Sequence, residues 1–408
     1  MKTQQIVSLG IGLLVAALLA IVFTSARNRN VSQVGASTER NRVMPSFPVN
    51  QITSVVMKDA KGSLTLEKKE SGWVVAERAG YPADFKKLGE FLRTMYDLAS
   101  VQKVEVGPSK FSRVGLLDPA DKAAGEGQSA TVVTFKKEKG EEVGSLWVGK
   151  EYKKEERSQF GTFDSTAGRY VRRGGSDEVY LVAEELREAT IEPKDWINKD
   201  FFKVAKVKSI SRTVADAAKS WKLTRESDTA DFTLVDAKKG EELDAAKVSS
   251  MKSAFSSPSF EDVLTGDKVP KPSEATILVE TFDGFRYETK FGPKNDLGEY
   301  DMTVSVSGEF STTRKAPEGE KEEDKKKADE EFSKNLETLK KQLAAEKKLA
   351  GHVYHVRGFV VDSLNKDRAD LMKSDEPAAT PDGPAAEGAA ANPGLPGLDM
   401  PLPALGGN

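Results

Sequence analysis

Short segments of alternating apolar and polar residues follow one another from about residue 52 onward. The first three cover residues 52–57, 63–68 and 73–77, and the turn dipeptides Lys61-Gly62 and Ser71-Gly72 separate them. Alternation with a period of two turns one side of each segment toward a core. Turn dipeptides between such segments are typical of hairpins. We therefore expect a meander of antiparallel strands here.

A helical period replaces this alternation after Tyr81-Pro82. Apolar residues recur at spacings of three and four from Phe85 to Leu98, and Asp84 stands where an N-cap is expected. We predict a helix whose apolar side lies on the sheet. Strand-like segments then return, and a helical stretch is expected from Ala183 toward residues 195–200. The predicted strands cover residues 101–106, 130–137, 143–150, 168–173 and 178–182.

The same order of elements returns in the second half of the chain. Residues 207–213 resemble the first strand, Leu243-Asp244 precedes a helix as Ala83-Asp84 does, and Asn365-Lys366-Asp367 resembles Asn198-Lys199-Asp200. Further matches are residues 221–226, 231–235, 260–264, 275–282, 287–292, 301–308 and 352–356. The shared order predicts an internal duplication. We expect an α+β fold of two tandem repeats, each an antiparallel sheet packed with helices, at residues 50–204 and 205–373.

A charged insertion interrupts the second repeat at about residues 312–350. It separates two predicted strands by about forty residues and contains Phe332, Leu336, Leu339 and Leu343 at alternating spacings of four and three. This spacing predicts a charged helix with a narrow, coiled-coil-like apolar seam. The seam is too short for a stable isolated coiled coil. The helix is expected either to lie back on its own domain or to protrude and bind a partner helix in a membrane protein complex.

An uncharged apolar run begins at Ile6 and ends at Phe23. Its eighteen residues would span roughly 27 Å as a helix, close to the hydrocarbon thickness of a bilayer. We expect residues 1–26 to be an N-terminal transmembrane anchor, with the lipid bilayer as its partner. The alternative is a cleaved signal peptide, for which Thr24 and Ala26 offer small residues at a cleavage site.

Polar segments flank the predicted body at both ends. Residues 27–49 contain several arginines and two prolines, which is typical of a polar stalk. Residues 374–408 are rich in Pro, Ala and Gly, so we expect a disordered tail. The arginines beside the apolar run favour a cytoplasmic body, whereas a single large domain after an N-terminal apolar segment is typical of export. We expect a single-pass protein of the bacterial inner membrane with an extracytoplasmic body.

Composition excludes some functions and leaves the body globular. The 408 residues are 38% hydrophobic and 31% charged, with a formal net charge of −3 and no cysteine. Basic and acidic residues are interspersed, so no nucleic-acid footprint is present. The two histidines, His352 and His355, fall in a predicted strand and would point to opposite faces, which disfavours a shared metal ion.

Catalytic motifs are missing or occur at chance frequency. The sequence has no phosphate-binding loop, no G-x-S-x-G elbow and no G-x-G-x-x-G after a strand. The S-x-x-K spacing occurs at Ser249/Lys252 and Ser363/Lys366 without its companion motifs, and Glu280 and Asp283 are better interpreted as solvated charges. The tryptophans fit core packing rather than a sugar platform. We predict no catalytic residue, metal site or cofactor.

Three features together resemble an uncharacterised bacterial family. They are the opening strands with Gly72-Trp73 and the Pro82-Ala83-Asp84 step, the G-L-x-D-P at residues 115–119, and the two V-Y-x-V endings. The chain is similar to the domain of unknown function family numbered 4340 from Ile52 to about Leu371. The resemblance implies an anchored envelope protein, in some cases beside gliding-motility-type ABC transport components, and supplies no catalytic residues.

These expectations lead to three functional hypotheses. The first is a non-catalytic accessory or scaffold protein of the bacterial envelope, auxiliary to an ABC-type transport or motility complex. The second is an extracytoplasmic module that binds glycan or peptidoglycan in an aromatic-lined cleft between the repeats. The third is a hydrolase with an unusual site near His352 or His355.

Overall fold

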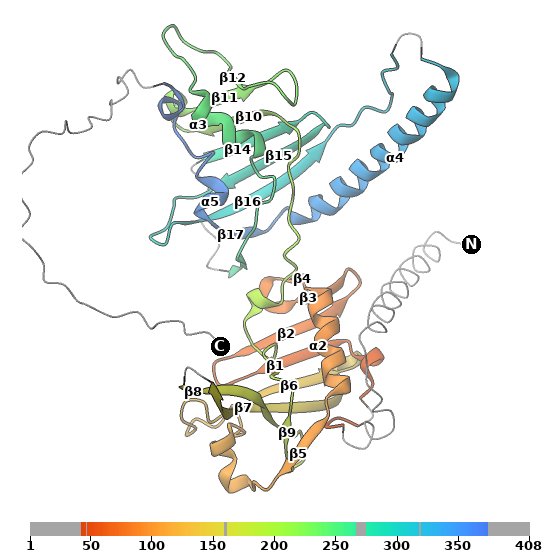
Figure 1. Ribbon diagram of the computed structural model, residues 1–408, viewed down its shortest axis with the longest axis vertical. Coiled ribbons are helices and arrows are strands. Elements are labelled where there is room, and N and C mark those ends of the chain that lie inside the picture. The colour runs from red at the N-terminus through yellow and green to blue at the C-terminus, as the bar shows by residue number, and fades with distance from the viewer. Residues whose placement is uncertain (1–41, 46, 159–160, 267–274, 318–319, 374–408) are drawn as a thin grey trace, which may run out of the picture.

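The computed structural model describes residues 42–45, 47–158, 161–266, 275–317 and 320–373. Two antiparallel sheets with a few helices make up this part of the chain (Figure 1), which confirms the α+β class. We call the nine-stranded sheet and its packing elements the first lobe, and the eight-stranded sheet and its packing elements the second lobe. The predicted anchor at 6–23 and tail at 374–408 lie outside the described residues. Among those described, no helix has both the length and the apolarity needed to cross a bilayer.

The sheet of the first lobe has the strand order β4-β3-β2-β1-β6-β7-β8-β9-β5. The strands are β1 (Ser54–Lys58), β2 (Ser63–Lys69), β3 (Gly72–Val75), β4 (Tyr81–Pro82), β5 (Ser100–Val104), β6 (Thr131–Lys136), β7 (Glu142–Ser158), β8 (Gly161–Arg173) and β9 (Val179–Val182). All its neighbouring strands pair antiparallel. The longest pairing, between β7 and β8, runs from Leu146↔Arg173 to Ser158↔Gly161.

Both faces of the first sheet are covered. Helix α2 (Phe85–Asp97) begins where Asp84 accepts a hydrogen bond from the Lys87 amide, and it buries Leu88, Phe91 and Met95 on one face. On the other face, a 3-10 segment, η3 (Pro108–Val114), contributes Phe111 and Val114 to a second, smaller core. The first lobe therefore has three layers, with the sheet between helix α2 on one face and the segment containing η3 on the other.

The sheet of the second lobe has the order β12-β11-β10-β14-β15-β16-β17-β13. Its strands are β10 (Val207–Val214), β11 (Trp221–Thr224), β12 (Thr233–Leu234), β13 (Asp262–Leu264), β14 (Ala275–Thr281), β15 (Phe285–Phe291), β16 (Glu299–Gly308) and β17 (Val353–Arg357). Short helices α3 (Ala245–Ser249) and α5 (Gly358–Val361) bury Val248, Val360 and Val361. The long helix α4 (Glu322–Glu346) joins β16 to β17.

The two sheets have corresponding strand orders, except that β4 has no counterpart in the second. Their local contacts also correspond. Asp84 and Asp244 each cap a helix with the side chain. Three residues later, Lys87 and Lys247 each donate from Nζ to a backbone carbonyl, at 2.8 and 2.6 Å respectively.

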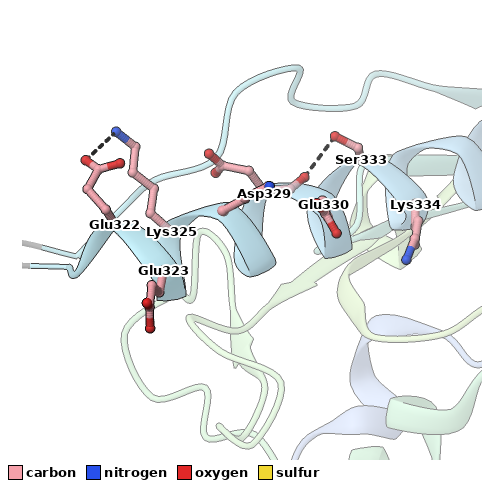
Figure 2. A pocket seen from close by; sticks show the side chains of 8 residues that line it. Glu322, Glu323, Lys325, Asp329, Glu330, Ser333 and Lys334 are labelled. Atoms are coloured by element: carbon pink, nitrogen blue, oxygen red, sulfur yellow. Dashed lines mark hydrogen bonds and ion pairs between the residues drawn. The ribbon is translucent and has the colours of Figure 1, made fainter.

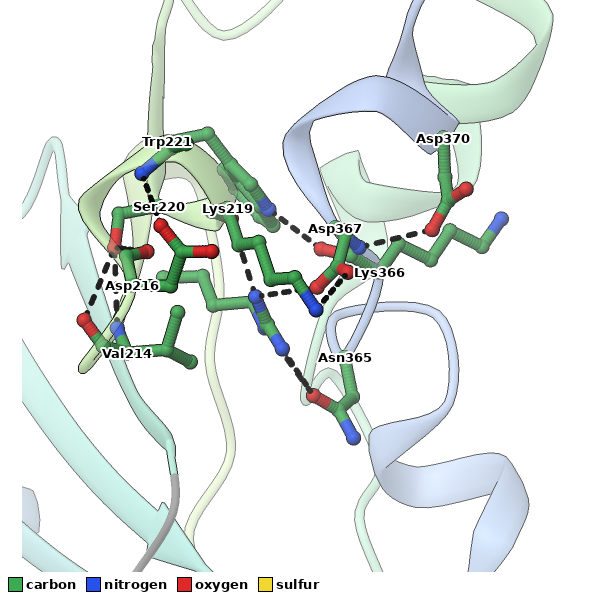
Figure 3. Close-up of polar contacts among 11 residues, drawn as sticks. Val214, Asp216, Lys219, Ser220, Trp221, Asn365, Lys366, Asp367 and Asp370 are labelled. Carbon is green, nitrogen blue, oxygen red and sulfur yellow. Dashed lines mark hydrogen bonds and ion pairs between the residues drawn. The ribbon is translucent and has the colours of Figure 1, made fainter.

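One of the sequence matches between the two halves is wrong, because Asn365-Lys366-Asp367 is not the structural counterpart of Asn198-Lys199-Asp200. Isolated bridges join Ala83 to Ile197 in the first lobe and Leu243 to Met372 in the second. The counterpart of Ile197-Asn198 is therefore Met372-Lys373, and Asn365-Lys366-Asp367 lies earlier. That tripeptide instead contacts the loop between β10 and β11 (Figure 3), where the Trp221 indole donates to the Lys366 carbonyl at 2.8 Å.

The helical stretch predicted from Ala183 is also wrong. Residues 183–192 form no helix, and only the 3-10 turn η5 (Pro193–Asp195) follows. Leu186 is buried and adopts a φ of 49°, which an α-helix does not allow. Burial of Leu186 and Ala189 against the core overrides the helix-favouring composition of this segment.

Candidate functional site

Helix α4 leaves the body of the second lobe and is the most distinctive feature of its surface (Figure 1). Glu322, Glu323 and Asp324 occupy its first turn, where negative charge complements the helix dipole. The C-terminal end returns to the sheet through the 3-10 turn η9 (Lys347–Leu349). The helix therefore has an outer N-terminal half and a base.

The base of α4 is held by a buried carboxylate. Glu346 is 8% exposed and accepts hydrogen bonds from the Tyr287 hydroxyl at 3.0 Å and the Lys203 amide at 3.2 Å. Gln342 donates to the same carboxylate at 2.9 Å. Burial, and then the negative charge of Glu346, raises the pKa of Tyr287 far above its ordinary value. Lys203 belongs to the segment between β9 and β10, which connects the two lobes. Glu346 therefore links α4 to β15 and to this connecting segment.

The apolar seam of α4 divides at the same place as the helix. Leu339 and Leu343 pack against the main hydrophobic core, whereas Phe332 and Leu336 lie beyond it and remain half-buried. Arg314, in the segment that leads into the helix, forms an ion pair with Asp329 at 2.8 Å. Both geometries expected for the insertion are thus present, since the base lies on its own lobe and the outer half extends past it.

A shallow groove of about 820 Å³ follows the outer half of α4 (Figure 2). All its lining residues belong to this one helix: Glu322, Glu323, Lys325, Lys326, Asp329, Glu330, Ser333 and Lys334. A groove with one wall does not enclose a small ligand. Its mixed charges instead form an elongated polar surface beside the seam.

The junction between the lobes combines an ion pair with packed aromatic rings. Arg78 of the first lobe donates two hydrogen bonds to Asp262 of the second, at 2.7 and 2.6 Å. The Tyr81 ring packs edge-on against Phe260 and Tyr354, both with centroids 6.1 Å away. Tyr81, Phe260 and Tyr354 are all 5% exposed or less. These aromatic side chains therefore pack against one another and are buried at the junction.

The two histidines have different environments. His352 lies against the Tyr81 ring, with centroids 5.0 Å apart, and burial lowers its pKa. His355 contacts Asp301 through Nδ1 at 2.8 Å and Glu299 through Nε2 at 2.9 Å. Burial alone would lower the pKa of His355, but these two carboxylates raise it above its ordinary value. Within the described ranges, no group of three or more His, Asp or Glu side chains has a metal-binding arrangement.

Four of the other sequence candidates each have a polar partner of their own. Glu280 accepts from Ser209 at 2.6 Å, and Asp283 forms an ion pair with Lys206 at 3.0 Å. The Ser249 hydroxyl donates to a carbonyl of its own helix, and Lys252 pairs with Asp231. These contacts leave no shared acid–base or nucleophile pair among them.

The tryptophans lie in or against the two cores. Trp196 and Trp221 are 0% and 3% exposed, and Trp73 and Trp147 are half-buried. Trp73 packs against the large hydrophobic cluster that extends through both lobes, and Trp147 packs against the smaller cluster of the first lobe. This agrees with a packing role.

Sequence reasoning missed a buried polar cluster that closes one end of the second lobe. Arg212, 8% exposed, donates twice to the Asn365 amide oxygen at 3.1 Å and pairs with Asp367 at 3.1 Å. Figure 3 shows Asn365 and Asp367 facing the loop that carries Lys219, which also pairs with Asp367 at 3.3 Å. The sequence signal for this cluster was Arg212, a charged residue at a position of β10 where the alternation predicts an apolar side chain. All three guanidinium nitrogens of Arg212 have partners, which suits a structural role.

The model of one protein family, described as Domain of unknown function (DUF4340), matches residues 73–276. The chain belongs to this family. The DUF4340 match begins in β3 and ends in β14, so it includes parts of both sheets. The predicted family is confirmed, and the envelope and transport context remains a prediction. No curated protein and no solved structure matches this DUF4340 chain.

Proposed function

We propose that this DUF4340 protein is a membrane-anchored, non-catalytic accessory or scaffold protein of the bacterial envelope. In this proposal the outer half of α4 binds a helix of a partner membrane complex, and the apolar run from Ile6 to Phe23 tethers the chain. The observation that carries the proposal is the division of α4 into a docked base and an outer half whose seam extends beyond the core.

The chemistry of the outer half favours a partner helix. Phe332 and Leu336 lie four residues apart, so they share one side of α4 and offer a narrow apolar stripe. Acidic and basic residues flank this stripe along the adjacent groove. Helices that dock on such a stripe use apolar anchors at matching spacing, with charges that set orientation. The small area implies a transient contact or one strengthened by membrane tethering.

A pull-down from membranes tests this surface. The variant Phe332→Glu with Leu336→Glu should lose the membrane complex that the wild-type chain captures. The matched control is Lys341→Glu, which makes the same charge change of −2 at an exposed position on the opposite side of α4. Equal capture by the wild type and the double variant, or the absence of any captured complex, would contradict the proposal. Two reporter fusions after Asn408, one active outside the cytoplasm and one inside, test the orientation.

We also propose that the two lobes arose by internal duplication, with later boundaries near residues 204 and 373. The first lobe begins before residue 50, within the predicted stalk, because Val43, Met44 and Phe47 are buried in the core. The corresponding strand orders, the equivalent caps at Asp84 and Asp244, and the equivalent bridges support the duplication. The packed rings at the junction lend no support to a glycan cleft there, and the clamped ring of His355 lends none to a hydrolase.

A further inference from the structure

A polar pocket of about 410 Å³, open to solvent and called the cavity below, is lined by residues of the first lobe only. It occurs where β7 parts from its neighbours. The pairing of β6 with β7 begins at Thr131↔Val148, and the register between β7 and β8 shifts between Val148 and Glu151. Such bulges commonly occur beside functional sites because they redirect side chains. Here the bulge places Lys150 and Glu151 at the rim of one cavity.

The cavity is strongly cationic. Its charged lining consists of Lys150, Lys153, Arg169 and Glu151, which gives a formal charge of +2. Glu151 is already engaged, by Arg169 at 2.9 Å and by the Thr166 hydroxyl at 3.3 Å. Neither lysine forms an ion pair with any residue that the structure describes. Among the described side chains, neither ammonium group therefore has a carboxylate partner.

Gly115 and Gly127, in the segment between η3 and β6, lie close to Lys150. A Cβ on Gly115 would lie 2.8 Å from Lys150 Cγ and 3.0 Å from its backbone nitrogen, and a Cβ on Gly127 would lie 3.8 Å from Lys150 Cε. Both glycines adopt positive φ, 70° and 66°. The stem of this exposed lysine thus passes close to both glycines, where a larger residue would displace it. Gly115 opens the G-L-x-D-P motif, whose role is otherwise unexplained.

We infer that this cavity binds a dianionic phosphate group, as found on a phosphate monoester. A phosphate monoester carries about −1.5 to −2 at neutral pH and would neutralise the +2 lining, whereas one carboxylate would leave it cationic. Lysine and arginine are the usual phosphate partners, and Ser129 and Thr131 add hydroxyl donors to the wall. The volume suits a small ligand. The group belongs either to a soluble ester or to a lipid headgroup. The site is independent of the proposed scaffold role.

Titration calorimetry of the full-length chain in uncharged detergent, with methyl phosphate as the probe, tests this inference. Saturable binding is expected, and Lys150→Gln should weaken it about 10-fold to 100-fold because one charge-assisted contact is lost. The matched control Lys154→Gln removes the same charge from the same hairpin, outside the cavity, and should change binding less than about twofold. Lys153→Gln is the second test should Lys150→Gln fail to fold.

Reconstitution distinguishes the two sources of the phosphate. If the ligand is a lipid headgroup, phosphatidylcholine vesicles containing phosphatidic acid should suppress methyl phosphate binding, and pure phosphatidylcholine vesicles should not. Unchanged binding in both assigns a soluble ester. No saturable binding, equal weakening by Lys150→Gln and Lys154→Gln, or acetate binding as tight as methyl phosphate would each overturn the inference.

Discussion

Replacing Glu346 by alanine should release the base of α4. The change removes the acceptor for the Lys203 amide and for the Tyr287 hydroxyl. The hydroxyl has a second acceptor, because the Lys203 carbonyl lies 3.2 Å away, so the main loss is one buried amide without a partner and one charge-assisted hydrogen bond. We expect a cost of about 2–3 kcal/mol.

Hydrogen exchange measures this cost locally. Amides of residues 339–349 should exchange roughly 30-fold to 140-fold faster in Glu346→Ala, since about 1.4 kcal/mol corresponds to a factor of ten. Urea unfolding followed by circular dichroism reports whether the rest of the fold is affected. The matched control is Glu337→Ala, an exposed glutamate of the same helix whose only ion pair, with Lys341, spans 3.9 Å among the described residues. Equal exchange in the two variants would refute the reasoning.

Three further predictions concern the rest of the molecule. Arg78→Met should loosen the junction and speed proteolysis between the lobes. Burial raises the pKa of Asp262, but the hydrogen bonds and charge of Arg78 lower it below its ordinary value. The wild-type protein should therefore lose this contact only as the pH falls through that depressed pKa. NMR titration should give His355 a pKa above the ordinary histidine value and His352 a pKa below it. Because the folded-state pKa of His355 is raised, its contribution to folding stability is complete below the unfolded-state pKa and is lost as the pH rises through the folded-state pKa. The variant His355→Gln should lack this pH dependence. Gly168→Ala should destabilise the first lobe by about 1–3 kcal/mol in thermal unfolding, because its φ is 141° and a Cβ would lie 2.0 Å from the Val182 carbonyl oxygen.

Local pattern was sufficient where it coincided with packing. Strands such as β14, whose buried and less buried residues alternate along its length, followed from period-two alternation. The caps at Asp84 and Asp244 followed from residue type and position. Both signals are contained in a few consecutive residues. This explains why the order of the elements was predictable.

Features that depend on contacts between residues far apart in the sequence could not be predicted from local patterns. The segment after Ala183 has helix-forming composition, yet Leu186 turns into the core and prevents the helix. The base of α4 depends on Glu346 meeting Tyr287, 59 residues away. The cationic cavity arises only because a glycine loop crosses a bulge in β7. No periodicity encodes such meetings.

The ends of the two sheets limit further growth of β-structure. Whereas β5 contains five residues, the other three of the four outermost strands are short: β4 and β12 contain two residues each and β13 contains three, and β4 includes Pro82. A strand this short offers an incoming chain few free amides and carbonyls, and proline offers no donor. Sheets of this size with long free edges would be more prone to edge-to-edge polymerisation. The short strands at three of the four edges therefore limit the ways in which two copies of this protein can join their sheets.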